Sequence, residues 1–191
     1  MKILKKILNN LFFILVVTNV NLVDKNTYDI VFNNQIKIKN VVLEKVNDSY
    51  IIKFPTYISK KGKIYPQIKI LTNELKEKII DSILHNNIQQ DNSELSWEIK
   101  KFYQYQKNKE SNLKMFCSIN FDNELEIDCK IMENKSGNTY VLWPSKKSFT
   151  GNTNIKQVLI KKNLKEKIEK ELLKRYNALK KEGGFDNFED N

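Results

Sequence analysis

The chain has 191 residues, of which 40% are hydrophobic and 29% charged, a composition typical of a folded protein with a buried core. Its 5 Gly, 3 Pro, 2 Cys and 1 His exclude collagen-like and low-complexity architectures, zinc fingers, His-based metal sites and disulfide scaffolds. The net charge of +10 indicates an anionic partner, either nucleic acid or a membrane surface. Because Arg175 is the only arginine, we expect attraction to phosphates rather than bidentate reading of bases.

The N-terminal extension, residues 1–16, begins with lysines and leads into an apolar run from Leu11 to Val17. This run is far shorter than the roughly 20 residues that a spanning helix needs, and no small-residue cleavage site follows it. We expect an extension packed on the domain of a cytoplasmic protein. A signal sequence or membrane anchor and an incorrectly assigned start codon are the alternatives.

A repeat organises the rest of the chain. The pentapeptide LKEKI occurs at Leu75–Ile79 and again, 89 positions later, at Leu164–Ile168. The same shift carries Phe54-Pro55 onto Trp143-Pro144 and Gly62 onto Gly151, and it places apolar residues of the early hairpin upon apolar residues of the later one. Several matches at one shift indicate a duplication.

The first copy, residues 17–85, is predicted to form strands and then one helix. Apolar and polar residues alternate as in half-buried strands. Leu75, Ile79 and Ile83 then recur at helical spacing after a cap at Thr72 or Asn73. In chain order we predict strands at 17–22, 29–32, 36–43, 50–54 and 64–71, with a hairpin loop at 33–35 and a basic, Gly-containing loop before the last strand.

A polar linker, residues 86–95, leads to the second copy, residues 96–182. In this copy we predict a helix that carries Leu164, Ile168, Leu172 and Tyr176 on one face, with Asn163 as N-cap and Glu166 completing a capping box. Gly183-Gly184 should end this helix before an acidic tail, residues 183–191. Strands are predicted at 97–102, 115–121, 125–131, 140–143 and 155–160. The predicted fold class is α+β: two tandem small modules, each an antiparallel sheet followed by a C-terminal amphipathic helix.

The two cysteines should face each other. A three-residue loop at Asp122–Glu124 pairs Phe121 with Leu125 and therefore Cys117 with Cys129. We expect reduced core thiols, and a disulfide is the alternative. The first copy carries Tyr28 and Asn40 at the matching positions.

The second copy resembles the SpoVG (stage V sporulation protein G) family of small bacterial regulators. Tyr140-Val-Leu-Trp-Pro-Ser-Lys-Lys147 is similar to the family's strand that ends in Pro-Ser-Lys-Lys, and Gly151 follows at the family's spacing. Phe121-Asp-Asn-Glu-Leu125 resembles its hairpin, and Val17–Leu22 resembles its opening strand. The resemblance covers about residues 17–84 and 96–180. The first copy departs from it at Pro55-Thr-Tyr-Ile58, where its lysines come later.

The resemblance implies a DNA- and RNA-binding regulator linked to septation or sporulation. Family members pair into dimers, so the two copies are expected to form a pseudo-dimer within one chain, and further homo-oligomers stay open. The nucleic-acid-binding residues expected are Lys146, Lys147, Lys156, Lys161 and Lys162 in the second copy and Lys60, Lys61 and Lys63 in the first. Trp97, Phe102, Trp143 and Phe149 are candidates for base stacking, although core packing is the commoner role.

No catalytic constellation is predicted. The chain lacks a phosphate-binding glycine loop and a nucleophile motif. Glu124 and Glu126 are interpreted as strand surface, and His85 has no partner of its kind. We expect no enzyme activity, cofactor, metal or small-molecule substrate. The alternative function is a protein-interaction or envelope-associated module in septum formation.

Overall fold

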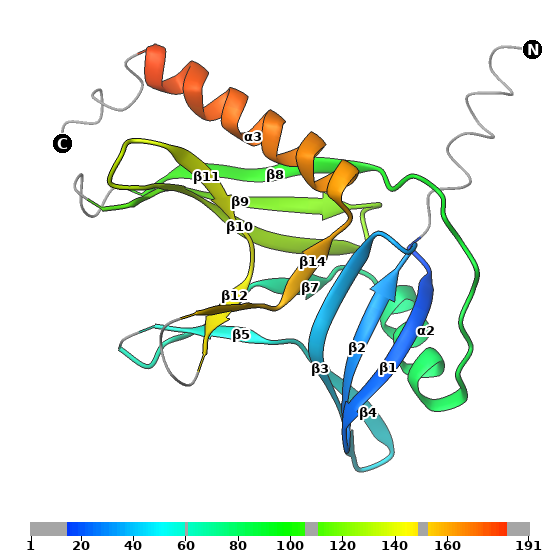
Figure 1. Ribbon diagram of the computed structural model, residues 1–191. Coiled ribbons are helices and arrows are strands. Elements are labelled where there is room, and N and C mark those ends of the chain that lie inside the picture. The colour runs from blue at the N-terminus through cyan, green and yellow to red at the C-terminus, as the bar shows by residue number, and fades with distance from the viewer. Residues whose placement is uncertain (1–14, 60, 106–110, 149–152, 183–191) are drawn as a thin grey trace, which may run out of the picture.

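The computed structural model describes residues 15–59, 61–105, 111–148 and 153–182 (Figure 1). They form two five-stranded antiparallel sheets, two short two-stranded ribbons and two helices, an α+β fold. Within these described residues, each half supplies seven strands followed by a helix.

The first sheet is built mainly by the N-terminal half. Its strand order is β1-β2-β3-β14, and β4 also pairs with β3. The strands are β1 (Val17–Asp24), β2 (Thr27–Phe32), β3 (Ile36–Val46), β4 (Ser49–Lys53) and β14 (Val158–Ile160).

The second sheet is built mainly by the C-terminal half. Its strand order is β11-β10-β9-β8, and β7 pairs with β10. The strands are β7 (Ile68–Ile70), β8 (Trp97–Gln104), β9 (Leu113–Phe121), β10 (Leu125–Glu133) and β11 (Thr139–Leu142).

The two halves exchange one strand each. Strand β7 joins the second sheet, where Ile68 pairs with Ile127. Strand β14 joins the first sheet, where Val158 pairs with Ile38. Each half therefore completes the sheet of the other half, as Figure 1 shows for β14 beside β3.

The strands predicted at 64–71 and 155–160 are each split in two. The first part of each belongs to a ribbon: β6 (Ile64–Pro66) pairs with β5 (Thr56–Ile58), and β13 (Asn154–Lys156) pairs with β12 (Ser145–Lys147). The breaks fall at Gln67 and Gln157, both buried. The Gln67 carbonyl accepts from the Asp128 amide, and the Gln157 carbonyl accepts from the Lys39 amide, both at 2.8 Å. The backbone carbonyl at each break is therefore paired with the opposite sheet as the chain passes from ribbon to sheet.

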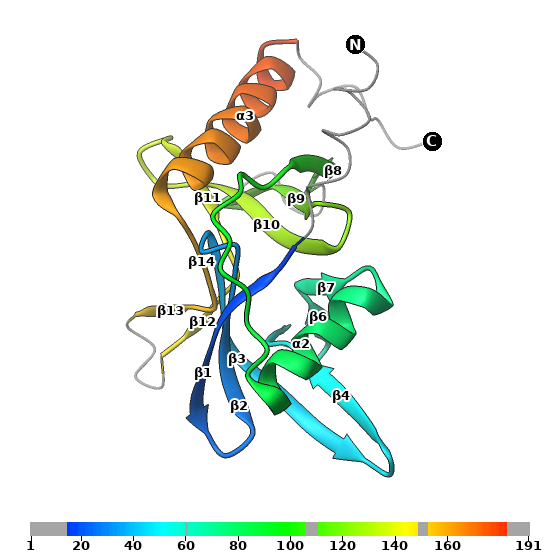
Figure 2. The same cartoon turned by 90° about the vertical axis from the view of Figure 1, so that its right-hand side faces the viewer.

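The helices lie on the outer faces of the sheets. Helix α2 (Asn73–His85) packs against β1 and β4, and α3 (Lys162–Lys181) lies across the second sheet (Figures 1 and 2). The predicted stripe of α3 is confirmed, since Leu164, Ile168, Leu172 and Tyr176 are all buried.

One of the two predicted helix caps is confirmed. The Thr72 hydroxyl accepts from the Leu75 amide at 3.2 Å. The prediction of Asn163 as N-cap is wrong, because the N-cap of α3 is Lys161, two residues earlier, and it makes no side-chain cap hydrogen bond. The Lys161 amide donates to the Gln35 carbonyl at 2.7 Å, so the chain leaves the first sheet at this residue and turns directly into the helix.

A single buried cluster joins both halves and includes Phe32, Ile36, Ile127 and Leu172. The segment 86–95 packs against the β2–β3 turn: the Asn33 side chain donates to Asp91 at 3.1 Å. The same segment ends with Leu95 in the core.

The two hairpins differ in register. Cys117 pairs with Cys129 as predicted, and both are free and buried. In the first half Tyr28 pairs with Val41 rather than Asn40, because Asn40 adopts a φ of 57° at a bulge, where its amide donates to Asp29.

The start of the described chain is packed. Leu15 and Val16 are buried, and the Leu15 amide donates to the Glu124 carboxylate at 2.8 Å. Residues 1–14 and the tail 183–191, including the predicted Gly183-Gly184 stop, lie outside the described residues. Within the described ranges, no helix has the length and apolarity to cross a bilayer.

Candidate nucleic-acid interface

Lys146 and Lys147 lie in strand β12, not in the loop that the sequence predicted. Both are exposed, and they pair with Ile155 and Asn154 of β13. The ribbon is held at its base, where the Gln157 amide donates to the Pro144 carbonyl at 2.9 Å. Side chains alternate along a strand, so Lys147 lies on one ribbon face with Lys156 and Lys146 lies on the other.

The second ribbon, β5–β6, occupies the equivalent place in the N-terminal half. Lys61 and Lys63 are exposed near its tip, and Lys60 lies outside the described residues. Tyr57 pairs with Tyr65, and their ring centroids are 6.2 Å apart.

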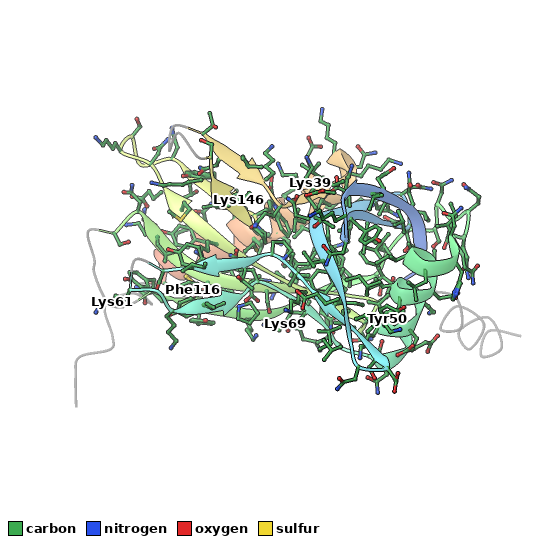
Figure 3. All side chains as sticks on the ribbon, turned by 90° about the horizontal axis from the view of Figure 1, so that it is seen from below. Lys39, Tyr50, Lys61, Lys69, Phe116 and Lys146 are labelled. Carbon is green, nitrogen blue, oxygen red and sulfur yellow. The ribbon has the colours of Figure 1, made fainter. Side chains whose placement is uncertain are left out.

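The two ribbons extend from the region between the sheets toward the same side of the molecule, as Figures 1 and 3 show. Lys146 marks one ribbon in Figure 3, and Lys61 marks the other. The structure therefore brings the candidate lysines of both halves to one side. Lys161 and Lys162 lie further along, at the start of α3.

The ribbons carry positive charge without compensating acids. Residues 56–66 and 145–156 contain no Asp or Glu. Elsewhere many lysines are paired: Lys37 lies 3.1 Å from Asp29, and Lys78 lies 2.9 Å from Glu74. In the described part of the chain, no ion pair involves Lys61, Lys63, Lys146, Lys147, Lys156 or Lys161.

Lys162 differs from the other candidates because its ammonium lies 3.9 Å from the Glu166 carboxylate. The segments around the ribbons lack Asp and Glu in the sequence. This absence of acidic residues indicates the basic surface more specifically than the lysines alone do. These runs without Asp or Glu extend over residues 49–73 and 134–165.

The aromatic residues predicted as stacking candidates are mostly packed. Trp143 is buried, and its indole nitrogen donates to Glu169 at 2.8 Å. Trp97 and Phe102 pack partly against the core, and Phe149 lies outside the described residues. Among the described Phe, Tyr and Trp residues, the exposed ones are tyrosines outside that predicted set: Tyr57, Tyr65, Tyr103 and Tyr140.

The interpretation of Glu124 and Glu126 as strand surface is wrong, since both are buried. Burial raises the pKa of Glu124, whose carboxylate accepts from the Leu15 amide and lies 3.8 Å from Lys78. Burial also acts to raise the pKa of Glu126, but hydrogen bonds from Lys101 and Lys69, at 2.8 and 2.7 Å, lower it below its usual value.

These carboxylates therefore serve packing and strand pairing, with each one held by its own partners. Among the residues that the structure describes, no group of His, Cys, Asp and Glu side chains is arranged to hold a metal ion. His85 is exposed and lies 2.8 Å from Asp81, one helical turn away.

One family model matches a part of the C-terminal half. Residues 98–178 match the SpoVG family. The SpoVG match spans β8 to β14 and most of α3, and it includes Lys146, Lys147, Lys156, Lys161 and Lys162. The N-terminal half, with Lys60, Lys61 and Lys63, lies outside it, so a second SpoVG copy there stays a prediction. No curated protein and no solved structure matches the chain.

Proposed function

We propose that this protein is a non-catalytic regulator that binds DNA or RNA through its two basic ribbons, in a septation- or sporulation-related role as the SpoVG match implies. The observation that carries the proposal is the charge of the ribbons, whose lysines project without any acidic neighbour in the ribbon sequence. Phosphate contacts by lysine give affinity with little base discrimination.

We also propose that the two halves act as an intramolecular pseudo-dimer. Three observations support this: the LKEKI repeat, the identical order of seven strands and a helix in each half, and the reciprocal exchange of β7 and β14. Fusion fixes two ribbons at one spacing, so that phosphate contacts by one ribbon raise the effective concentration of the other.

A titration of the full chain against an unrelated DNA duplex and a single-stranded RNA, at 50 and 200 mM salt, tests the function. Binding through lysine–phosphate contacts should weaken steeply as salt rises, since each contact releases condensed counterions. Absence of binding at the lower salt, or affinity that does not change with salt, would contradict the proposal.

A further inference from the structure

Two aromatic rings, Tyr57 and Phe116, flank Lys130 where the β5–β6 ribbon meets the second sheet, and further rings lie beside them. Lys130 pairs with Phe116 on β9, and Phe116 pairs with Tyr103 on β8. The neighbouring Cys117 and Cys129 are buried in the core with α3, so Phe116 and Lys130 lie on the opposite face of the sheet. From the ribbon, Tyr57 contributes its ring to the same cluster.

Contacts within this cluster are short. The Lys130 ammonium lies 4.5 Å from the centroid of the Tyr57 ring and 5.9 Å from that of Phe116. The Phe116 centroid is 5.4 Å from that of Tyr103. On the ribbon, the Lys63 ammonium lies 5.3 Å from the Tyr65 ring. Two cations are thus interleaved with rings from four strands.

Lys130 is a half-buried cation with no carboxylate in ion-pair contact among the residues that the structure describes. Burial lowers the pKa of Lys130, which reflects incomplete solvation of its charge, and the field of Asp128 offsets this only in part. An anion at this point would gain a direct contact with little further desolvation of the ammonium.

The rings themselves remain accessible. Tyr57, Tyr65 and Tyr103 expose 41%, 42% and 55% of their surface. Exposed rings interleaved with lysines match the chemistry of an unpaired nucleotide, whose base offers a flat π-face and whose phosphate offers a negative charge. Bases inside a duplex are stacked on one another and are not available to such rings.

We infer that this cluster binds single-stranded nucleic acid: Tyr57, Tyr65 and Tyr103 stack on unpaired bases while Lys130 and Lys63 contact phosphates. The inference rests on the proposed function, and it assigns a different part of nucleic-acid binding to each ribbon. The repeat places Tyr57 where the other ribbon has Lys146. One ribbon therefore presents ammonium groups for any phosphate backbone, and the other presents rings for single strands.

The test uses the full chain with two probes, a 12-nucleotide oligothymidylate and a 20-base-pair duplex of unrelated sequence. We expect Tyr57→Leu/Tyr65→Leu to weaken oligothymidylate binding on the order of tenfold or more, because base–aromatic stacking contributes about 1–3 kcal/mol per base. Duplex binding should change less than about twofold. Tyr57→Phe keeps the ring and should retain affinity for both probes.

Tyr50→Leu is the matched control, since Tyr50 lies on β4, at the other end of the molecule from Phe116 (Figure 3). Tyr103→Leu lies on β8, outside the ribbon, and should also weaken oligothymidylate binding selectively. This result would show that the loss does not come from a misfolded ribbon. Lys130→Gln should reduce the salt slope for the single strand by about 1.

The possible failures are distinguishable. If the tyrosine variants leave oligothymidylate binding unchanged, or weaken both probes equally, while wild-type binding depends on salt, the inference is wrong and the proposed function stands. If the wild-type chain binds neither probe, the proposed function fails, and with it the inference. Retention of oligothymidylate by the variants, together with loss of binding to an acidic peptide, would assign the cluster to a protein partner and overturn the inference.

Discussion

Ile160 at the end of β14 pairs with Ile36 at the start of β3, so one of the last strands of the chain completes the sheet that the first strands begin. Its counterpart is the pairing of Ile70 with Leu125 in the other sheet. Both exchanged strands contribute residues to one shared core. The two halves should therefore unfold together in a single cooperative transition.

Replacement of Ile36 by Ala should lower the free energy of unfolding by about 2–5 kcal/mol, the usual cost of a large buried truncation. Both tryptophans, Trp97 and Trp143, lie in the C-terminal half. In a urea titration followed by tryptophan fluorescence, the midpoint should nevertheless shift with this N-terminal substitution. Val23→Ala, at an exposed site on β1, should leave the midpoint unchanged. An unshifted midpoint for Ile36→Ala would show that the halves unfold separately.

Lys146→Ala/Lys147→Ala should weaken duplex binding more than Lys60→Ala/Lys61→Ala does. If Lys146 and Lys147 each neutralise one phosphate, the double substitution lowers the salt slope by about 2 and affects unrelated sequences alike. Affinity measured over a salt series checks this. Both variants lose the same charge, so equal losses would show that bulk charge, rather than the β12 geometry, determines binding.

Ionisation of Glu124 should cost stability. Burial raises its pKa in the folded protein, so the folded state binds this proton more tightly than the unfolded chain does. The resulting contribution to the free energy of unfolding is fully present below the ordinary pKa of a glutamate carboxyl, and it is lost as pH rises from there through the raised pKa of the folded state. Glu124→Gln should therefore gain stability relative to wild type across that window, while its amide oxygen still accepts from Leu15.

Urea unfolding of Glu124→Gln and wild type at several pH values between 4 and 7 measures this difference. Lys78 keeps its contact with Glu74 at 2.9 Å, so the substitution leaves that ammonium paired. Glu98→Gln, at an exposed strand position, controls for the loss of one negative charge. A stability difference that stays constant with pH would refute the linkage.

Cys117 and Cys129 should resist alkylation in the native protein. Their mutual hydrogen bond, together with burial, holds the pKa of Cys129 well above its usual value, and the thiolate is the reactive species. Iodoacetamide labelling followed by mass spectrometry should show slow modification in buffer and rapid modification of both thiols in urea. A Cys117–Cys129 bridge in protein alkylated during lysis would contradict the expectation of reduced thiols.

Local structure was predictable because it leaves a periodic trace in the sequence. The three-residue loop after Phe121 fixes the pairing of Cys117 with Cys129, and the fourfold spacing from Leu164 to Tyr176 fixes the buried face of α3. These features depend on residues a few positions apart.

The strand exchange was not predictable for a physical reason. The repeat gives both sheets equivalent apolar edges, Ile36 with Ile38 in one and Leu125 with Ile127 in the other. The alternating pattern of Ile68 and Ile70 fits either edge, so it indicates a strand without selecting its partner. In the sequence, each break is marked only by one polar residue, Gln67 or Gln157, within an apolar run, and this does not indicate a change of sheet.

Part of the candidate site was likewise accessible from sequence. The basic character of the ribbons follows from lysines near Pro55 and Pro144. The ring cluster around Lys130 needed the fold, because Tyr57, Tyr103 and Phe116 come from strands in different halves and meet only after β7 has crossed to the second sheet.

The pairing of β14 with β3 also sets an order of events during synthesis. When the first sheet emerges from the ribosome, the edge of β3 at Ile36–Ile38 has no partner strand. The strand that pairs with it, β14 at Val158–Ile160, is translated near the end of the chain. A nascent N-terminal half therefore exposes an unpaired strand edge for most of its translation. Folding of this protein should therefore depend on the late insertion of β14, a non-local pairing that makes folding slow for a chain of this size. The chain should be most prone to aggregation before its release from the ribosome.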